Sequence, residues 1–346
     1  DLTVTFAAPK VAHVLVPAAG AVGELVVTDL GIPPRLIEEV AEPGGRLHLL
    51  VGEELAGWLP KREDDAHKGD FGHVLLVAGS PGKAGAAILG ARAAVRAGAG
   101  LVTVAVPEPI LNPVDLGSLE SMTIGLPAGA SGQLAAEAAG AVVTAAKGKA
   151  VVALGPGLGQ EPETAAAIRR MVLAAEPPVV LDADGINAFA GRAGELRGRQ
   201  APTVLTPHPG ELGRLLGMST ADVQAGRLAA VRRAAAETGA VVVLKGSRTL
   251  IGAPDGEGNI TVWVNPTGNP GMASGGSGDV LTGLAAGLIA QREAYGLEVL
   301  DAVLLAVYLH GLAGDLAVQK TGENALAAGD LVDSLGAAFA DLVSPK

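Results

Sequence analysis

One glycine-rich stretch, residues 265–279, constrains the fold of this chain more than any other feature, because it runs directly into an apolar segment at residues 280–289. Apolar residues recur in that segment at helical spacing, so the sequence predicts a loop that opens a buried helix near Asp279. Three glycines would let the loop backbone approach a bound group closely: Gly275, Gly276 and Gly278. The first turn of such a helix can bind phosphate, with the Asp279 carboxylate beside it. Alternatively, Asp279 only caps the helix.

The composition narrows the classes of protein to which the chain can belong. Its 346 residues can bury a large core, and its net charge of −11 argues against nucleic acid or an acidic membrane surface as a partner. Without cysteine it has no disulfide, thiolate metal site or cysteine nucleophile, which is compatible with a reducing cytosol. Continuous apolar runs such as residues 302–309 fall short of the ~20 residues that a membrane span needs. Because the first residue is Asp, we expect a processed chain or a fragment.

Short apolar runs alternate with alanine-rich segments from residue 73 onward. Strands are predicted at residues 74–78, 101–106, 150–154, 179–181, 204–205 and 241–244. Helices are predicted at residues 85–98, 132–147, 161–175 and 220–238. This pattern is typical of an α/β fold with a central, mostly parallel sheet that helices cover on both faces. The pair 249–253 and 260–264 is expected to form an antiparallel edge, and residues 1–50 make too little core to stand alone.

The loops that follow the predicted strands are the places to look for a ligand, because open α/β sheets bind ligands at the carboxyl ends of their strands. Residues 78–87 and 155–159 are rich in glycine, whose bare backbone can lie against a flat ring. Neither loop has the spacing of a dinucleotide fingerprint, so ordinary tight turns remain the alternative for each.

Two further loops carry polar side chains. His208 lies between two prolines, which stiffen the backbone and favour a positioned ligand contact over a core histidine. Glu211 could contact a hydrated Mg²⁺, although an acid in the first turn of a helix is the plainer interpretation. Residues 245–249 follow a buried strand and offer a cation, hydroxyls and amides that suit phosphate or adenosine.

Together these loops resemble a known family. From about residue 55 to its end, the chain is similar to the ADP-dependent NAD(P)H-hydrate dehydratases, a branch of the ribokinase-like superfamily. The segments that carry the resemblance are residues 67–72, 78–80 with 85–87, 96–102, 155–159, 181–187, 206–211, 245–249 and, above all, 275–283. Small-molecule kinases of the superfamily typically have Asn where this chain has His208, so the histidine favours the dehydratase branch.

The resemblance implies a ribokinase-like fold and repair of damaged NADH or NADPH, whose nicotinamide ring has added water. It implies ADP or ATP as phosphoryl donor with Mg²⁺, acceptance of only the S epimer, a homo-oligomer and a cytoplasmic location. Asp279 would be the catalytic base and contact the substrate. The nucleotide would be bound by Lys245, Gly246, Ser247, Arg248, Thr249 and Gly278. The hydrated dinucleotide would be bound by Ala86, Gly157, Gly159 and His208.

The first residues resemble a different domain. Residues 1–10 and 23–33 are similar to the last strands of the NAD(P)H-hydrate epimerase domain, which precedes the dehydratase in many bacteria. We therefore expect residues 1–50 to be the C-terminal fragment of an epimerase domain with a linker, and residues 51–346 to be the dehydratase domain. Two rival functions remain: a ribokinase-like kinase acting on a vitamin precursor or sugar, and a nucleotide-binding protein without catalysis.

Overall fold

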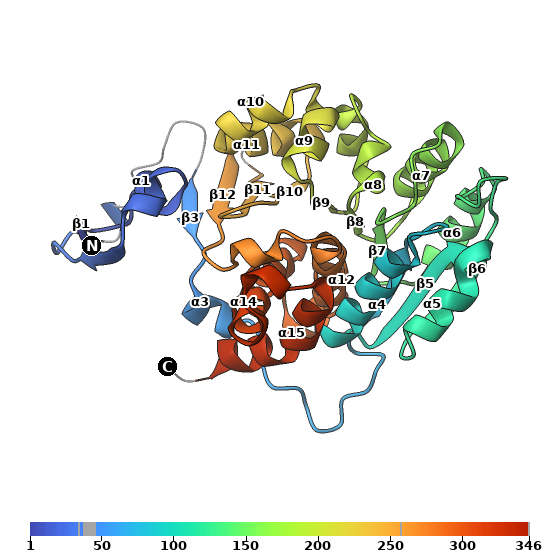
Figure 1. Cartoon of the computed structure of the whole chain (residues 1–346), viewed down its shortest axis with the longest axis horizontal. Coiled ribbons are helices and arrows are strands. Elements are labelled where there is room, and N and C mark those ends of the chain that lie inside the picture. The colour runs from blue at the N-terminus through green and yellow to red at the C-terminus, as the bar shows by residue number, and fades with distance from the viewer. Residues whose placement is uncertain (34, 37–45, 257, 345–346) are drawn as a thin grey trace.

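A ten-stranded sheet forms the centre of the protein in the computed structural model, which describes residues 1–33, 35–36, 46–256 and 258–344 (Figure 1). In spatial order its strands are β3 (Leu47–Leu49), β12 (Ile260–Val264), β11 (Leu250–Pro254), β10 (Val241–Leu244), β9 (Thr203–Leu205), β8 (Val179–Leu181), β7 (Val151–Leu154), β4 (His73–Val77), β5 (Leu101–Pro107) and β6 (Met122–Leu126). Neighbouring strands are parallel except that β11 is antiparallel to both β10 and β12. The expected mostly parallel sheet is confirmed.

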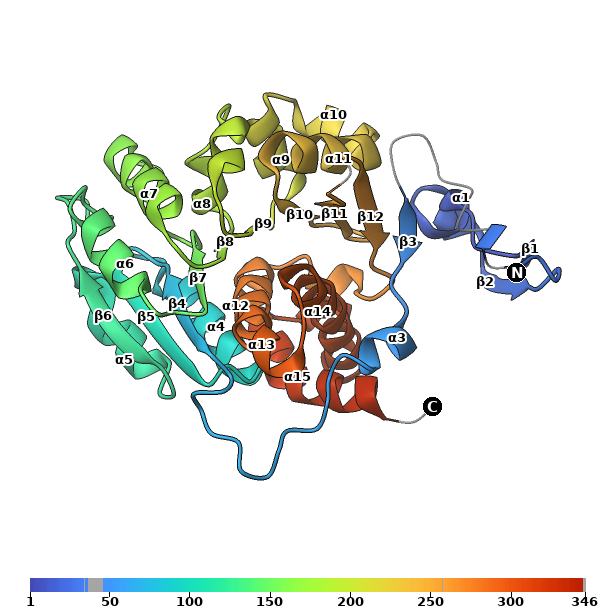
Figure 2. The same ribbon diagram turned by 180° about the vertical axis from the view of Figure 1, so that it is seen from behind.

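Helices cover both faces of this sheet (Figure 1; Figure 2). One layer contains α4 (Ala84–Arg96), α5 (Leu111–Gly117), α12 (Ser277–Ala290), α14 (Val299–Thr321) and α15 (Ala328–Val343). The other contains α6 (Ala138–Ala146), α7 (Pro162–Ala174), α8 (Asp184–Asn187), α9 (Pro209–Leu216), α10 (Thr220–Ala225) and α11 (Arg227–Thr238). The short helices described after residue 50 outside these two layers are α3 (Gly52–Ala56), α13 (Arg292–Tyr295), η2 (Glu108–Ile110), η3 (Ala193–Gly198), η4 (Pro270–Met272) and η5 (Glu323–Ala325).

The buried strands explain why both faces need a cover. In β4, Val74 and Leu76 pack into the core beneath α12 and α14, whereas Leu75 and Val77 pack into the core on the opposite face. Alternate side chains of a strand point to opposite faces, so a continuous apolar run has two apolar faces. Both faces are buried here, and the loops at the strand ends are left to carry polar chemistry.

The structure differs from the sequence predictions at both edges of the sheet and in one predicted helix. Strands β11 and β12 are antiparallel as expected, but they are not the edge, because β3 pairs with β12 in parallel. Strand β6 was not predicted, since its residues are half exposed at the other edge of the sheet. The segment predicted as one helix at residues 220–238 is two helices, α10 and α11, which meet at Gly226.

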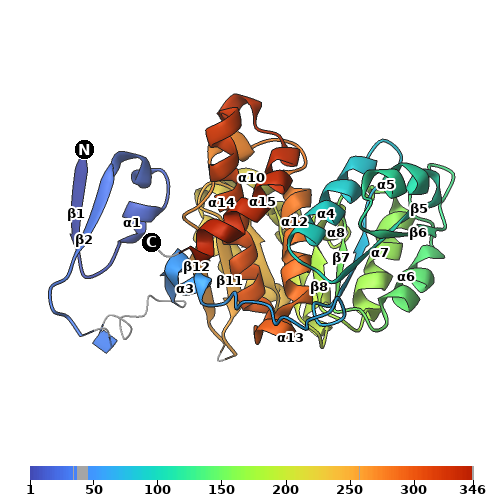
Figure 3. The ribbon, with the colours of Figure 1, turned by 90° about the horizontal axis from the view of Figure 1, so that it is seen from below.

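The N-terminal residues form a separate small element beyond the β3 end of the sheet (Figure 1; Figure 3). Strands β1 (Leu2–Phe6) and β2 (Glu24–Thr28) pair in parallel, and α1 (Val11–Val14) and η1 (Ala18–Ala21) connect them. Its apolar side chains are poorly covered: Leu2 is 60% and Phe6 50% exposed. Strand β3, which lies within the expected N-terminal segment 1–50, pairs with β12 of the main sheet. Part of the connector, residues 34 and 37–45, lies outside the described residues.

Helix α14 would meet the length and hydropathy of a membrane span, which the short apolar runs of the sequence did not lead us to expect. It has 23 residues, and 67% of its most apolar window is buried inside the protein. It packs against α12 and α15, so its apolar side chains already have partners within the fold.

Candidate active site

The polar loops converge at the carboxyl ends of the central strands. Asp182 follows β8, His208 follows β9 and Lys245 follows β10, while the first turn of α12 approaches the same place from the helical layer. Because these strands are parallel neighbours, segments far apart in the sequence meet at one edge of the sheet.

Helix α12 begins at Ser277, two residues before the expected start near Asp279. Its N-cap is Gly276, with φ 96°, a left-handed conformation that favours glycine. A Cβ on Gly276 would also lie 2.7 Å from the Leu89 side chain. Gly278 and Asp279 therefore stand in the first turn, where backbone N–H groups lack intrahelical acceptors and the helix dipole attracts an anion.

Close packing of α12 against α4 fixes this first turn in space. A Cβ added to Gly283 would lie 2.0 Å from the carbonyl oxygen of Gly90, and one added to Gly287 would lie 2.5 Å from the Cβ of Ala97. Glycine at both positions lets the two helices approach at backbone distance. The small residues of the sequence thus position the anion-binding end of the helix.

Lys245 is the cation of the site. Its Nζ lies 2.7 Å from Oδ1 of Asp182 and 3.8 Å from Oε2 of Glu211. A Cβ on Gly278 would be 3.1 Å from the same Nζ, so the ammonium lies directly against the first turn of α12. The Lys245 side chain is 21% exposed, whereas that of Asp182 is 2% exposed. The ammonium can therefore reach a ligand at the helix start while its partner remains buried.

The electrostatics of the cluster favour a protonation change near neutrality. Burial, followed by the charge of Asp182, raises the pKa of Asp279 to about 6, against the opposing influence of Lys245. Burial also raises the pKa of Glu211. Burial works against the charge of Lys245, but Asp182 and Glu211 outweigh it and raise the pKa of the ammonium. Asp279 can thus accept a proton at physiological pH, as a general base must.

The loop after β10 is held in shape by Arg227, which sequence reasoning did not single out. The guanidinium donates to the carbonyl oxygen of Ser247 at 2.6 Å and to that of Leu244 at 3.2 Å. Gly246 has φ 134°, outside the range that side chains readily adopt. The loop therefore bends at residues 246–248, directly after Lys245.

Two other residues of this loop make internal contacts. Arg248, with φ 52°, donates to the carbonyl oxygen of Pro266, which joins the loop to the start of the glycine-rich stretch. The Thr249 hydroxyl donates to the carbonyl oxygen of Gly246 at 3.1 Å and is partly exposed. Both side chains have structural tasks beside any contact with a nucleotide.

Both ring nitrogens of His208 are engaged within the chain. It is the N-cap of α9: Nδ1 accepts from the backbone N–H groups of Gly210 at 3.0 Å and Glu211 at 3.3 Å. Nε2 lies 3.3 Å from Oε1 of Glu211. The ring is half exposed, so what it offers a ligand is its face and edge rather than a free nitrogen.

A second group of loops presents backbone rather than charge. The Ser80 hydroxyl donates to the carbonyl oxygen of Gly157 at 2.7 Å and ties the loop after β4 to the loop after β7. A Cβ on Gly157 would lie 3.2 Å from the Cβ of Ala86 and 3.1 Å from that of Lys83. Gly157 and Ala86 are therefore neighbours, and a side chain at position 157 would fill the space beside them.

Gly159 lies deeper than Gly157. Its N–H donates to Oδ2 of Asp184 at 2.8 Å, and an added Cβ would lie 1.9 Å from Oε1 of Gln133. Gly159 is buried, and its hydrogen bond to Asp184 helps to fix the shape of the loop. Ala183, with φ 48°, separates Asp184 from Asp182, so that one carboxylate faces this loop and the other faces Lys245.

The residue that sequence reasoning missed is Asp182. It was noted only as part of a resembling segment, although an acidic residue directly after a buried strand at the ligand-binding edge is a signal in itself. Thr282 of α12, whose hydroxyl donates to Asp182, was missed as well. A threonine inside an apolar helix gives no sign in the sequence that it contacts a carboxylate.

The site does not form a protein cage for a metal ion. Among the described residues, no group of three or more His, Asp or Glu side chains is arranged to hold one. Asp182, Glu211 and Asp279 come near one another, but the Lys245 ammonium lies among them. This arrangement suits Mg²⁺ that keeps its waters and arrives with nucleotide phosphates.

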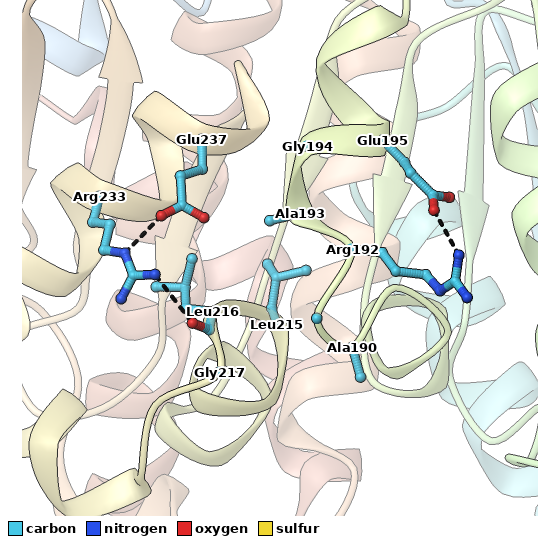
Figure 4. A pocket seen from close by; sticks show the side chains of 11 residues that line it. Ala190, Arg192, Ala193, Gly194, Glu195, Leu215, Leu216, Gly217, Arg233 and Glu237 are labelled. Atoms are coloured by element: carbon cyan, nitrogen blue, oxygen red, sulfur yellow. Dashed lines mark hydrogen bonds and ion pairs between the residues drawn. The ribbon is translucent and has the colours of Figure 1, made fainter.

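A broad pocket lies elsewhere, on the side of the sheet that α8, α9 and α11 cover (Figure 4). Its volume is about 880 Å³, and its two arginines are paired: Arg192 with Glu195 and Arg233 with Glu237. None of its lining residues belongs to the convergent loops. Cavity size therefore does not identify the site; the convergence of glycines, Lys245 and the carboxylates does.

Comparison with known proteins adds the family. Residues 74–336 match the pattern of the NAD(P)H-hydrate dehydratase family, a span that contains all the loops described above. The chain belongs to this family. It is 36% identical over 286 residues to the ADP-dependent (S)-NAD(P)H-hydrate dehydratase of Bacillus subtilis, with 82% of this chain and 94% of that protein covered.

Some longer relatives are named as bifunctional enzymes. The chain is 45% identical over 333 residues to the bifunctional NAD(P)H-hydrate repair enzyme of Moorella thermoacetica, with 96% of this dehydratase-family chain but only 61% of the relative covered. The chain therefore spans about three fifths of the length of such relatives.

Solved structures agree on the fold. The Bacillus subtilis ADP/ATP-dependent NAD(P)H-hydrate dehydratase co-crystallised with ATP and Mg²⁺ superposes with a TM-score of 0.72 at 34% identity, covering 85% of this chain and 98% of that one. A ribokinase-like superfamily protein of Enterococcus faecalis has a TM-score of 0.71 at 26% identity, covering 86% and 97%. The expected ribokinase-like fold is confirmed.

Proposed function

We propose that this protein uses a nucleotide to dehydrate the S epimer of hydrated NADH or NADPH, restoring the reduced dinucleotide. The observation that carries the proposal is Asp279 in the first turn of α12, with its pKa raised to about 6, beside the Lys245 ammonium. A base that titrates near neutrality next to a phosphate-binding helix start suits phosphoryl transfer to a hydroxyl. The name of the Bacillus subtilis relative supports the same reaction.

The chemistry explains why a nucleotide is needed. Hydroxide is a poor leaving group from C6 of the hydrated ring. Asp279 takes the proton of the C6 hydroxyl while the oxygen of that hydroxyl attacks the terminal phosphorus of ADP. AMP leaves, and the oxygen on C6 then carries the phosphoryl group as a phosphate ester. The C6–O bond then breaks, the electron pair of the ring nitrogen replaces it, and orthophosphate leaves. Loss of a proton from C5 restores the C5–C6 double bond of the reduced nicotinamide.

The candidate site residues form two groups, one for each ligand. Lys245, Gly246, Ser247, Arg248, Thr249 and Gly278 bind the nucleotide, and the Lys245 charge and first-turn amides stabilise the transferring phosphoryl group. Ala86, Gly157, Gly159, His208 and Asp279 bind the hydrated dinucleotide, with the ring of His208 in contact through its face. Gly159 acts by shaping its loop, since its own N–H already donates to Asp184.

Mg²⁺ would supply charge neutralisation of the nucleotide phosphates when bound. Glu211 faces Lys245 and would contact such an ion only through its waters. Either ADP or ATP would serve as donor, in keeping with the name of the solved Bacillus subtilis relative.

We also propose, from the resemblance, that residues 1–50 are the C-terminal part of an epimerase domain with a linker, and that the dehydratase acts as a cytoplasmic homo-oligomer. Light scattering of the purified chain tests the oligomer. The exposed apolar residues of β1 and β2 lack a cover among the described residues, which supports their assignment to part of a larger domain.

Incubation with an epimeric mixture of hydrated NADH, Mg²⁺ and either nucleotide tests the proposed function. We expect absorbance of reduced nicotinamide to return with release of orthophosphate, and the rapid phase to stop when the S epimer is consumed. The R epimer would point its hydroxyl away from Asp279, beyond the ~3 Å reach of a base. A stable phosphorylated alcohol would instead indicate a kinase, and nucleotide binding without any product would indicate a sensor.

A further inference from the structure

Asp182 is the most fully enclosed charged group at the site and contacts three other structural elements. Its Oδ1 accepts from the Thr206 hydroxyl at 2.9 Å and from Nζ of Lys245 at 2.7 Å. Its Oδ2 accepts from the Thr282 hydroxyl of α12 at 2.9 Å. The residue is 1% exposed, so water does not replace these partners. One carboxylate thus joins the ends of β8, β9 and β10 to the first turns of α12.

The contact with Lys245 decides where the ammonium lies. A lysine side chain is long and flexible, and two other carboxylates, Glu211 and Asp279, compete for its charge. Glu211 is 3.8 Å away and Asp182 only 2.7 Å. The shorter, charge-assisted bond holds Nζ against the backbone of Gly278 and keeps it from pairing closely with Asp279.

We propose that Asp182 is a positioning residue that holds the Lys245 ammonium at the first turn of α12, where the transferring phosphoryl group passes. This inference rests on the proposed function. Asp182 itself touches no reacting atom. It acts by directing the charge of Lys245 toward the phosphoryl group and by leaving Asp279 free to accept a proton.

The first test is the activity of Asp182→Asn, with Thr206→Val as the matched control. Asn is nearly isosteric but cannot hold the ammonium by charge, so we expect kcat to fall about 10- to 100-fold, which is less than the loss of a direct transition-state donor because Lys245 itself remains. Thr206→Val removes one hydrogen bond to the same carboxylate and keeps its charge. We expect that variant to lose at most about threefold.

The pH profile supplies a readout that a loosened structure would not move. The charged groups that face Asp279 are Asp182 from the end of β8, Lys245 from the end of β10 and Glu211 from α9. Removing the negative charge of Asp182, and freeing Lys245 to turn toward Asp279, both favour the ionised form of Asp279. The acid limb of kcat/KM should therefore move to lower pH in Asp182→Asn and stay in place in Thr206→Val.

A binding measurement tests the inference independently of dehydration. ADP with Mg²⁺ is titrated into the wild type, Asp182→Asn, Lys245→Ala and the double variant. If Asp182 positions Lys245, the loss caused by Lys245→Ala should be smaller by about threefold or more in the Asp182→Asn background. This coupling can be measured even if hydrated NADH proves not to be the substrate, so failure of the proposed function and failure of this inference are distinguishable.

Should Asp182→Asn fail to fold, Asp182→Glu replaces it in both experiments. Glu keeps the charge but displaces the carboxylate by one methylene, so kcat should fall while the acid limb remains. Additive effects of the 182 and 245 substitutions on ADP affinity in folded proteins would overturn the inference, as would wild-type kcat in either folded variant of Asp182.

Discussion

The two halves of the site differ in what they offer a ligand. The half around the ends of β8 and β10 and the start of α12 contains the charges of Asp182, Lys245 and Asp279 within a few ångströms. The half formed by the loops after β4 and β7 offers glycine backbone, with Gly157 against Ala86. Substitutions of charge should therefore change rate and nucleotide affinity, whereas an added side chain in the glycine half should change the fit of the dinucleotide.

The largest expected effect is that of Asp279→Asn. Because Asn cannot accept the hydroxyl proton, kcat should fall on the order of 10²- to 10⁴-fold, while ADP affinity measured by titration changes little. In the wild type the acid limb of kcat/KM should lie near pH 6, since Asp279 must be ionised to act and its pKa is about 6. Near-normal turnover of the variant would remove Asp279 from the mechanism.

Lys245→Ala should mainly weaken the nucleotide. Loss of one charge-assisted contact is worth roughly 1.5–3 kcal/mol, or about a ten- to hundredfold rise in the Kd of ADP. Thr249→Val should act in the same direction and more weakly, since its hydroxyl already donates to Gly246. Lys147→Ala, at an exposed position after α6, is the control for loss of a positive charge. A collapse of dinucleotide binding with unchanged ADP affinity would mean that the two halves have been assigned in reverse.

Gly157→Val should weaken the hydrated dinucleotide about tenfold, an order-of-magnitude expectation for a side chain forced into a ligand's space. Its Cβ would stand 3.1–3.2 Å from Lys83 and Ala86. Gly148→Val is the matched control, because Gly148 has a similar φ, +69° against +66°, but open space around it. A loss of dinucleotide affinity only at position 157, with equal losses of stability in the two variants, would place the dinucleotide against Gly157; equal dinucleotide affinities of the two variants would contradict that assignment.

The smallest expected effect is on stability. The folded-state pKa of Asp279 is raised from 3.8 to about 6, so the folded protein binds a proton more tightly than the unfolded chain does. Stability from this group is therefore present below about pH 4 and is lost as the pH rises through 6. Asp279→Asn has no carboxyl group to ionise and so avoids this loss of stability. Its Tm should therefore exceed that of the wild type by roughly 2–5 °C at pH 8. The difference should vanish near pH 4, and a variant less stable than the wild type at pH 8 would contradict the buried-charge account.

Much of the fold could be predicted from the sequence because its signals are local. Runs such as residues 74–78 are apolar on both faces and had to be central strands. Strand β3 and strand β6 were missed or misplaced, because edge strands have only one buried neighbour strand and their residues are mixed in character. The break at Gly226 between α10 and α11 depends on tertiary packing that helical spacing does not report.

The site was predictable where glycine marks it. The loop at residues 275–279 and Lys245, both singled out in the sequence, lie together in the structure. The capping role of His208 is local, with partners two and three residues away, and was overlooked in the sequence. The bonds of Asp182 to Thr206 and Thr282 could not be predicted, since they join residues 24 and 100 positions apart. Side-chain direction across such separations comes only from the folded structure.

In the proposed reaction, the charged half of the site phosphorylates the hydroxyl that the glycine half holds. The most direct measurement uses NADH hydrated in ¹⁸O-labelled water, so that the C6 hydroxyl carries the label, followed by mass spectrometry of the products after reaction with ADP and Mg²⁺. Phosphoryl transfer to that oxygen predicts one ¹⁸O atom in the released orthophosphate for each reduced dinucleotide formed. Label found in bulk water, with unlabelled orthophosphate, would mean that the hydroxyl leaves without being phosphorylated and would contradict the account.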